Sequence, residues 1–402
     1  MQPLKGIQVI EFEGIGPGPL AGMMLADLGA TVTVIGRFGG IALREQLRGA
    51  GMVDTLGRGK QFVRINLKQP EGVELALKLV EKADAIIEGN RPGVMERLGL
   101  GPDVCLRRNP KLVYGRMTGW GQTGPLSQAA GHDINYVALT GLLSLAARPG
   151  ELPQVPPTVL GDAAGGLNLA FGIVSGVLGA RSTGKGVVID AAMIDAAASL
   201  GSLALSLKAA GMLNGKHPSA FHDSPFYDAY ECADGKAITI GALEPQFYAV
   251  LMEKLGLSDV PLGKQYDSRT WPELKQRLTS LFKSKPREAW CELLEGTEAC
   301  FAPVLTLEEA AAHPHNVARR MYHDDGRQIQ AAAAPRFSDN GSASLPVGAD
   351  VECRLSTADP LHRREAVPRE TPVSPLTKDA ILQSLGVTAE RIAELKTAGI
   401  VG

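Results

Sequence analysis

Two side chains in the first half of this 402-residue sequence have types suited to acid–base chemistry. His132 stands beside a carboxylate, a carboxamide and a phenol in the run from Gly131 to Tyr136. Histidine takes up a proton near neutral pH, although a lone histidine often has a purely structural place. Asp162 precedes an apolar helix that runs to about Gly179, so it is either an N-cap or a carboxylate that the helix dipole holds ionised. In the second case it suits a base or a nucleophile.

A third candidate, Glu244, comes in the second half of the chain, directly before Pro245. The residue before a proline adopts an extended or turn conformation, so Glu244 is expected in a loop. Two interpretations stay open at this point. It is a plain loop acid, or it is the carboxylate that orients and charges His132 from another domain.

Spaced cations form a second pattern, which fits a phosphate-bearing ligand. A glycine-rich turn at 14–19 follows a predicted strand, but Arg37 stands where a dinucleotide site usually has an acidic residue. An arginine there fits NADP or the 3′-phosphate of coenzyme A, or is simply solvated beside a tight turn. Lys68, Arg91 and Arg97 follow along the chain. Several cations at strand ends would serve the phosphates of coenzyme A, while single surface cations are ordinary.

The elements that must position these residues alternate between strand and helix. Residues 6–12 predict a strand, which the glycine-rich turn joins to a helix through Leu28 and a second strand at 31–35. Further strands are predicted at 85–87, 112–114 and 187–189, with a helix from Pro70. This order predicts an α/β fold with a parallel sheet. Gly165 and Gly166 weaken the start of the apolar helix, which makes sense if a ligand approaches the backbone.

A second, smaller α+β domain is predicted after a polar stretch. A hairpin with its turn at 233–235 and helices at 272–282 and 287–294 indicate it. We therefore expect a large domain from 1–207 and 320–402, a linker at 208–224 and a small domain at 225–310. Residues 331–374 read as an extended crossing segment or linker, and two short helices at 378–385 and 389–398 close the chain.

Composition excludes several classes of protein. With 41 basic and 43 acidic residues the net charge is −2, so no positive field predicts binding to nucleic acid. The apolar stretches at 167–180 and 196–207 are predicted to be too short for a membrane span, and no signal peptide is expected. Five cysteines without a CxxC pair fit reduced thiols in a cytoplasm. His313, His315 and His323 match no metal-site spacing, so no metal is expected.

Several longer stretches carry a family resemblance. The sequence closely resembles the α-methylacyl-CoA racemases, a branch of the type III CoA-transferase superfamily, from Leu4 to about Phe337 and more faintly beyond. The resemblance rests on residues 14–19, 91–99, 117–125, 131–136, 183–186 and 241–248. The runs at 132–136 and 244–248 are similar to the racemase branch in particular.

The resemblance implies a fold, a reaction and a set of roles. The fold would be an interlocked homodimer, each chain with a Rossmann-like large domain and a small domain. His132, polarised by Glu244, and Asp162 would be two bases on opposite faces of the α-carbon of a 2-methylacyl-CoA, inverting C2 through an enolate without a cofactor. The residues implied to hold coenzyme A are Arg37, Ile65, Asn66, Leu67, Lys68, Asn90, Arg91, Arg97, Gly131, Asp133 and Tyr136.

Two other functions stay open beside the racemase. In a CoA-transferase, Asp162 would attack the thioester and form a mixed anhydride; in a binding protein, the CoA ester would be held without reaction. The sequence also departs from the family pattern, and these departures bear on acyl-group preference. They are Gly36 and Phe38 around Arg37, Asn66 in place of a usual Asp, the stretch from Lys216 to Ser224, and Leu376-Thr377 in place of a His-Thr pair.

Overall fold

The computed structural model describes residues 2–38, 53–147, 150–213, 218–324, 328–337 and 376–402, which form two compact units. The first unit comprises residues up to Leu200 together with the described residues of 322–337 and 376–402. The second begins at Gly201 and runs to Met321. Helix α9 (Ser202–Ala209) therefore lies in the second unit and crosses position 207, where the sequence placed the end of the large domain.

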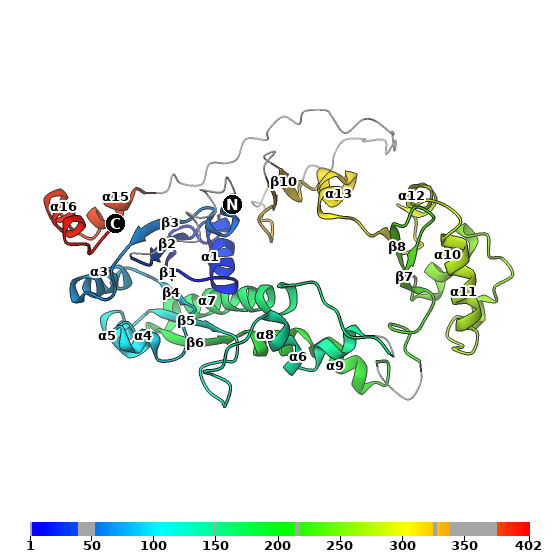
Figure 1. The fold of residues 1–402 in the computed structure, drawn as a ribbon, viewed down its shortest axis with the longest axis horizontal. Helices are drawn as coiled ribbons and strands as arrows, with labels where there is room; N and C mark the ends of the chain where they lie inside the picture. Colours follow the sequence, from blue (N-terminus) through cyan, green and yellow to red (C-terminus); the bar gives the residue numbers. More distant parts are fainter. Residues whose placement is uncertain (1, 39–52, 148–149, 214–217, 325–327, 338–375) are drawn as a thin grey trace. The chain divides into compact units, whose positions relative to one another are not determined.

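The first unit is built on a six-stranded parallel sheet with the order β3-β2-β1-β4-β5-β6 (Figure 1). Its strands are β1 (Gln8–Phe12), β2 (Thr31–Gly36), β3 (Gln61–Arg64), β4 (Ala85–Glu88), β5 (Val113–Thr118) and β6 (Val187–Ala192). The α/β fold and the parallel sheet are thus confirmed. The sequence missed β3, because a four-residue strand with only Val63 fully buried gives almost no alternating pattern.

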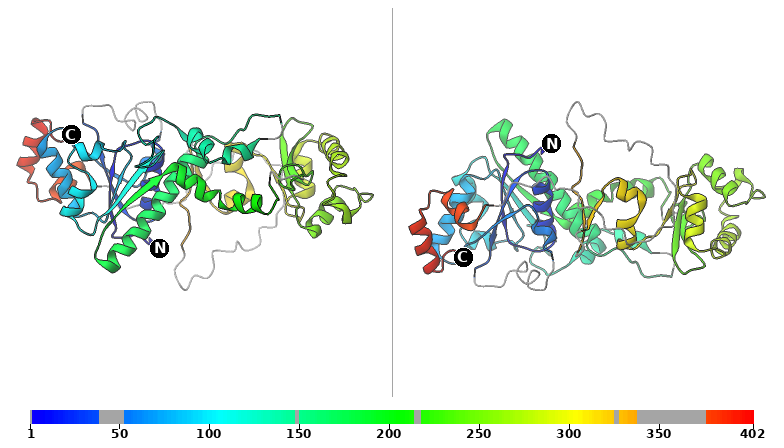
Figure 2. Two further views of the ribbon diagram at one scale, coloured as in Figure 1. Left: turned by 90° about the horizontal axis from the view of Figure 1, so that it is seen from below. Right: turned by 90° about the horizontal axis from the view of Figure 1, so that it is seen from above.

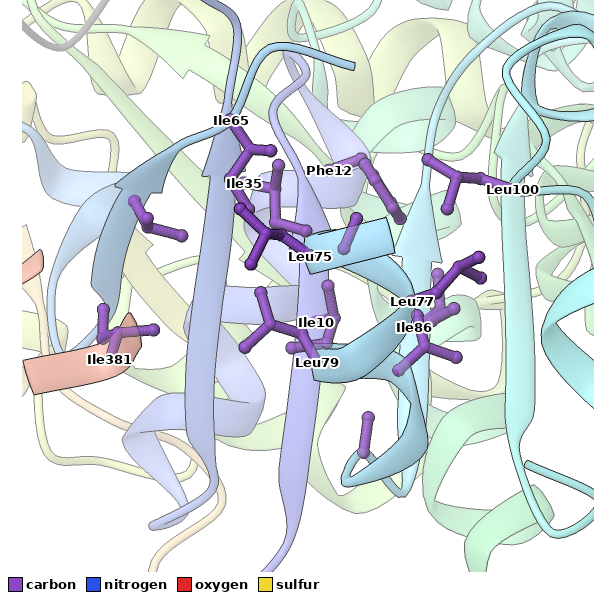
Figure 3. Packing of buried hydrophobic residues seen from close by; sticks show 14 of the residues in the cluster. Ile10, Phe12, Ile35, Ile65, Leu75, Leu77, Leu79, Ile86, Leu100 and Ile381 are labelled. Atoms are coloured by element: carbon purple, nitrogen blue, oxygen red, sulfur yellow. The ribbon is translucent and has the colours of Figure 1, made fainter. Parts of the chain in front are cut away.

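Helices cover both faces of this sheet. On one face lie α1 (Pro17–Asp27) and α7 (Ala164–Thr183), and on the other α3 (Pro70–Glu81), α5 (Pro102–Arg108) and the C-terminal α15 (Lys378–Gln383) and α16 (Ala389–Thr397). Figure 3 shows the hydrophobic core on the face covered by α3, in which Leu75 and Leu79 of α3 pack among Ile10, Ile35 and Ile86 of the strands. Burying these apolar faces is what fixes the helices on the sheet.

The C-terminal residues close the β3 edge of the sheet. Val401 forms a β-bridge with Ile65, and α15, which packs against α16, contacts β3 (Figure 1). The Asn66 side chain donates a hydrogen bond from Nδ2 to the Gly399 carbonyl at 3.1 Å. An aspartate has no such donor, so this contact requires the asparagine at position 66.

Helix α7 is longer than the sequence predicted. A π-helical turn, η3 (Val159–Ala163), precedes it, and the continuous helix Val159–Thr183 has 25 residues with a mean hydropathy of 1.6 over its apolar window. By length and composition alone it could cross a membrane, so the expectation of stretches too short to span one was wrong. The core helix of a folded domain passes the same test. One side of α7 packs against β5, β6 and α1, and Figure 2 shows it lying along the sheet.

The glycines at the start of α7 serve helix packing. A Cβ on Gly165 would lie 2.7 Å from Cγ of Met193, at the start of α8 (Met193–Leu200). A Cβ on Gly166 would lie 2.9 Å from the Pro17 carbonyl in α1. The expectation that these glycines admit a ligand to the backbone was therefore wrong, because neighbouring helices occupy that space.

The second unit contains a three-stranded antiparallel sheet flanked by helices, as predicted for the α+β part. Its strands are β7 (Tyr227–Glu231), β8 (Ala237–Gly241) and β9 (Phe301–Pro303), and its larger helices are α10 (Pro245–Lys254), α11 (Trp271–Phe282) and α12 (Arg287–Leu294). The hairpin turn lies between Glu231 and Ala237 as expected. Most of the predicted extended segment 331–374, and Lys216, lie outside the described residues.

Candidate active site

A cavity of about 390 Å³ opens at the carboxyl ends of β1, β4 and β5 in the first unit. Ligands of open parallel sheets bind where the strand order reverses, and here that point lies between β1 and β4. The cavity is lined by the glycine-rich turn 14–19, by Asn90 to Pro92, by Trp120 and by the segment 129–132. His132 and Asp162 both line it, so the structure brings these two predicted bases to one cavity.

The segment that carries His132 is held by its own neighbours. His132 is the N-cap of α6 (Asp133–Leu139), and its backbone N–H donates to Asn135 Oδ1 at 3.0 Å. The Tyr136 hydroxyl donates to the Gly131 carbonyl, and its ring meets Trp120 edge-on with centroids 4.7 Å apart. The motif 131–136 thus fixes the backbone on both sides of His132. Burial and the charge of Asp162 raise the pKa of Tyr136, which keeps it a hydrogen-bond donor.

Asp162 lies inside the π-helical turn η3. One interpretation of the sequence made it the N-cap of the apolar helix, and that interpretation was wrong, because the N-cap of α7 is Ala163. Its carboxylate faces the glycine-rich turn, where a Cβ on Gly16 would lie 3.7 Å away. Among the described residues no hydrogen bond to that carboxylate is formed. Burial first, and then the charge of Asp133, raise the pKa of Asp162, while His132 lowers it. A half-buried, unbonded carboxyl group of raised pKa in a cavity is suited to acid–base work.

A second cavity, of about 360 Å³, adjoins the first and contains most of the remaining predicted ligands of coenzyme A. Phe12 and Asn90 line both cavities. The second is also lined by Arg37, Ile65, Asn66, Leu67 and Lys68. Arg37 is exposed, and its backbone N–H donates to Glu13 Oε2 at 2.7 Å. The Ile65 side chain is only 1% exposed and belongs to the core, so chiefly its backbone is available to a ligand.

Of the other residues predicted to bind coenzyme A, some line the first cavity and some line neither cavity. Arg91, Gly131 and Tyr136 line the first cavity. Arg97, the last residue of α4 (Val94–Arg97), lines neither cavity, and its guanidinium lies close to Gly93, the N-cap of the same helix. Asp133 is buried, lines neither cavity, and its side chain is turned toward η3.

Sequence reasoning missed an ion cluster beneath the loop that starts at Asn90, in which Arg116 and Glu88 are buried and Glu96 is 45% exposed. Arg116 of β5 pairs with Glu88 of β4 at 3.0 Å and with Glu96 of α4 at 2.9 Å. Glu88, whose side chain is fully buried, also accepts the Asn90 backbone N–H at 2.7 Å. Charges inside otherwise apolar strands were the available signal, because a buried charge needs a partner.

A second missed pair supports the glycine-rich turn. Lys60 and Glu11 are both almost completely buried and lie 2.6 Å apart, and Lys60 Nζ also donates to the Pro19 carbonyl at 2.8 Å. A Cβ on Gly22 would lie 1.8 Å from Glu11 Oε2, so any other residue there would displace this ion pair. The pair therefore anchors the beginning of α1 to the sheet.

Glu244 belongs to the second unit, where it is exposed at the N-cap of α10. Its carboxylate raises the pKa of Tyr266 and of Cys300, after burial as the main cause in each case. Its predicted role toward His132 stays a prediction. Among the described residues, no group of three or more His, Cys, Asp or Glu side chains is arranged to hold a metal ion.

Comparison with known proteins identifies the family of this chain. Residues 4–348 match the CoA-transferase family III. The chain is 41% identical over 329 residues to the α-methylacyl-CoA racemase of Mus musculus, covering 81% of this chain and 84% of that one. It is 42% identical over 319 residues to the racemase of Homo sapiens, covering 79% and 81%. The crystal structure of Rv3272 from Mycobacterium tuberculosis superimposes with a TM-score of 0.70 at 30% identity, covering 84% of this chain and 93% of that one. This chain belongs to the CoA-transferase family III.

Proposed function

We propose that this protein is a racemase that inverts C2 of 2-methylacyl-CoA thioesters by two-base deprotonation and reprotonation through an enolate. The observation that carries the proposal is that His132 and Asp162 line one cavity. The 41–42% identity to α-methylacyl-CoA racemases supports the choice of reaction within the family. A thioester acidifies its α-proton, and two positioned bases each contribute roughly 10²–10⁴-fold to the rate.

Coenzyme A would extend across both cavities. Arg37 and Lys68 supply cations in the second cavity, and Asn90 lines both, which gives a continuous path from phosphate-binding charges to the two bases. Arginine and lysine side chains commonly bind phosphates through charge-assisted hydrogen bonds. We therefore assign the phosphates to the second cavity and the thioester to the first.

The two bases would differ in how they are tuned. Asp162 has a raised pKa, so part of its population carries a proton at a higher pH than an ordinary aspartate would. It can then return a proton to the enolate as well as remove one from the substrate. His132 would act on the opposite face of the α-carbon, with Glu244 as its predicted orienting carboxylate.

Isotope exchange with single-base variants tests the proposal. In D₂O the wild-type protein should exchange the α-proton of both epimers of a 2-methylacyl-CoA and interconvert them. His132→Ala should deuterate one epimer with retention, because Asp162 still removes and returns a proton on its own face. Asp162→Asn should show the mirror preference. The control is Asp84→Asn, which changes a carboxylate that accepts the Gln8 backbone N–H at the amino end of β1, and it should leave both exchanges intact.

Two outcomes would refute this function. Equal exchange of both epimers in both base variants would rule out two bases on opposite faces. Capture of an acyl group on Asp162 by hydroxylamine during turnover, with dependence on a free carboxylic acid, would instead establish acyl transfer through a mixed anhydride.

The assembly and the surroundings of the enzyme are part of the same proposal. We expect a cytoplasmic, cofactor-free homodimer. The face of α7 turned away from the sheet exposes Leu167, Phe171 and Leu178, with Phe171 and Leu178 each 71% exposed. Three large apolar side chains on one helix face support burial against a second copy of the chain.

A further inference from the structure

Asp133 connects the two segments that carry the proposed bases. It is the first residue of α6, directly after His132, and only 8% exposed. Its Oδ1 atom accepts the backbone N–H of Gly161 and that of Asp162, each at 2.7 Å. Hydrogen bonds from backbone N–H groups to a carboxylate are short and about twice as strong as neutral ones. One carboxylate oxygen therefore holds the turn η3 against the start of α6.

The local backbone depends on this contact. Thr158, which precedes η3, has a φ of 63°, so the turn is entered through a left-handed residue. The first N–H groups of a helical segment lack intrahelical partners, and Asp133 supplies one for two of them. A Cβ on Gly161 would lie 2.6 Å from Asp133 Oδ1, so only glycine permits this approach. The conformation of η3 therefore depends both on the absence of a Cβ at Gly161 and on the carboxylate of Asp133.

The nearby carboxylate of Asp133 also affects the ionisation of Asp162. The groups identified as acting electrostatically on the Asp162 carboxyl are His132 and Asp133 at the start of α6, and Asp162 in turn acts on Tyr136 of the same helix. From the neighbouring α1 and α8, Gly16, the N-cap of α1, and Met193, the first residue of α8, line the cavity, and neither carries a charge. After burial, the negative charge of Asp133 is the main cause that raises the pKa of Asp162. The same side chain therefore places Asp162 and opposes its ionisation.

We propose that Asp133 is a positioning residue for the reaction, whose carboxylate fixes the Asp162 turn at a set distance from His132, and not a ligand of coenzyme A through its side chain. The kinetic effects expected of Asp133 variants rest on the proposed two-base function. The geometry on which the inference stands, the two backbone hydrogen bonds to one buried oxygen, does not depend on which reaction the site performs.

Two substitutions separate the geometric part from the electrostatic part. Asp133→Asn keeps an oxygen acceptor and removes the charge, so the pKa of Asp162 should fall. The acidic limb of the pH–rate profile for the Asp162-dependent exchange should then move to lower pH, while KM for the acyl-CoA stays unchanged. Asp133→Ala removes both hydrogen bonds. Displacement of a reacting group by about 1 Å costs on the order of 100-fold, so kcat should fall by that amount for both epimers with KM little changed.

A readout independent of catalysis keeps the inference testable if the enzyme is not a racemase, or if Asp133→Ala fails to fold. The carboxyl carbon of Asp162, labelled with ¹³C and assigned through Asp162→Asn, should titrate at lower pH in Asp133→Asn than in the wild type. Asp84→Asn, which removes a carboxylate that accepts a backbone N–H at the amino end of β1, should leave that titration in place. An unmoved Asp162 titration, or a rise in KM without a change in kcat, would overturn the assignment. Absence of any α-proton exchange in the wild type would overturn the proposed function alone.

Discussion

Replacing Arg116 with methionine tests the ion cluster beneath the Asn90 loop. The change removes the cation and keeps a side chain of similar length, so Glu88 is left with a fully buried carboxylate and no counter-ion. Removing one partner of a buried pair costs about 3–5 kcal/mol of the free energy of unfolding, because the remaining charge stays desolvated. We expect a loss of that size for Arg116→Met in guanidinium unfolding at pH 7.

Arg108→Met is the matched control. Arg108 also pairs with two carboxylates, Glu74 and Glu81, but it is 35% exposed and its partners are 48% and 41% exposed. Water screens the charges of exposed ion pairs, so this variant should lose much less stability than Arg116→Met. Equal losses for the two arginines would refute the reasoning from burial.

The deficit of Arg116→Met should also depend on pH, with a definite sign. Burial already raises the pKa of Glu88 above its usual 4.5, and Arg116 opposes that shift. Without Arg116 the folded-state pKa rises further, so the deficit is largest at pH values above it and shrinks as the pH falls and Glu88 takes up a proton. Adding Glu88→Gln, which keeps an acceptor for the Asn90 N–H, should restore much of the lost stability. A deficit that is independent of pH and is not relieved by Glu88→Gln would mean that lost packing, and not an unpaired charge, is responsible.

Other predictions concern ligand binding, assembly and chemistry. Arg37→Ala should raise KM for acyl-CoA roughly 10–100-fold with kcat nearly unchanged, as expected for a lost charged hydrogen bond; Arg97→Ala should have a smaller effect because Arg97 lines neither cavity. An unchanged KM for Arg37→Ala removes it from the site. Phe171→Glu should shift the mass measured by light scattering from dimer toward monomer, and a monomeric wild type would contradict the proposed assembly. Exposed Cys300 should react with iodoacetamide before buried Cys105, whose pKa burial raises to about 12, as peptide mapping would show. Turnover should survive EDTA, and its loss would argue against a metal-free mechanism.

Local sequence patterns determined five of the six strands of the parallel sheet and their order along the chain. The glycine-rich turn between two apolar runs predicted β1, α1 and β2, and Pro70 marked the beginning of α3. Such signals are local: alternation and helical spacing report which face of an element is buried, and proline and glycine report where it begins and ends. The residue types of His132 and Asp162 likewise predicted the acid–base chemistry that we propose for them.

Tertiary structure decided what these residues touch. The sequence could not tell that Gly165 and Gly166 admit neighbouring helices, that Asp162 lies within a π-helical turn, or that Asn66 binds the carbonyl of Gly399 near the C-terminus. Each of these depends on a contact between segments distant in the chain, and periodicity carries no information about such partners. Asp133 is the clearest case. Beside His132 it reads as one more polar residue of the site, and only the folded chain brings its carboxylate to the backbone of Gly161 and Asp162, where a buried charge must find its donors.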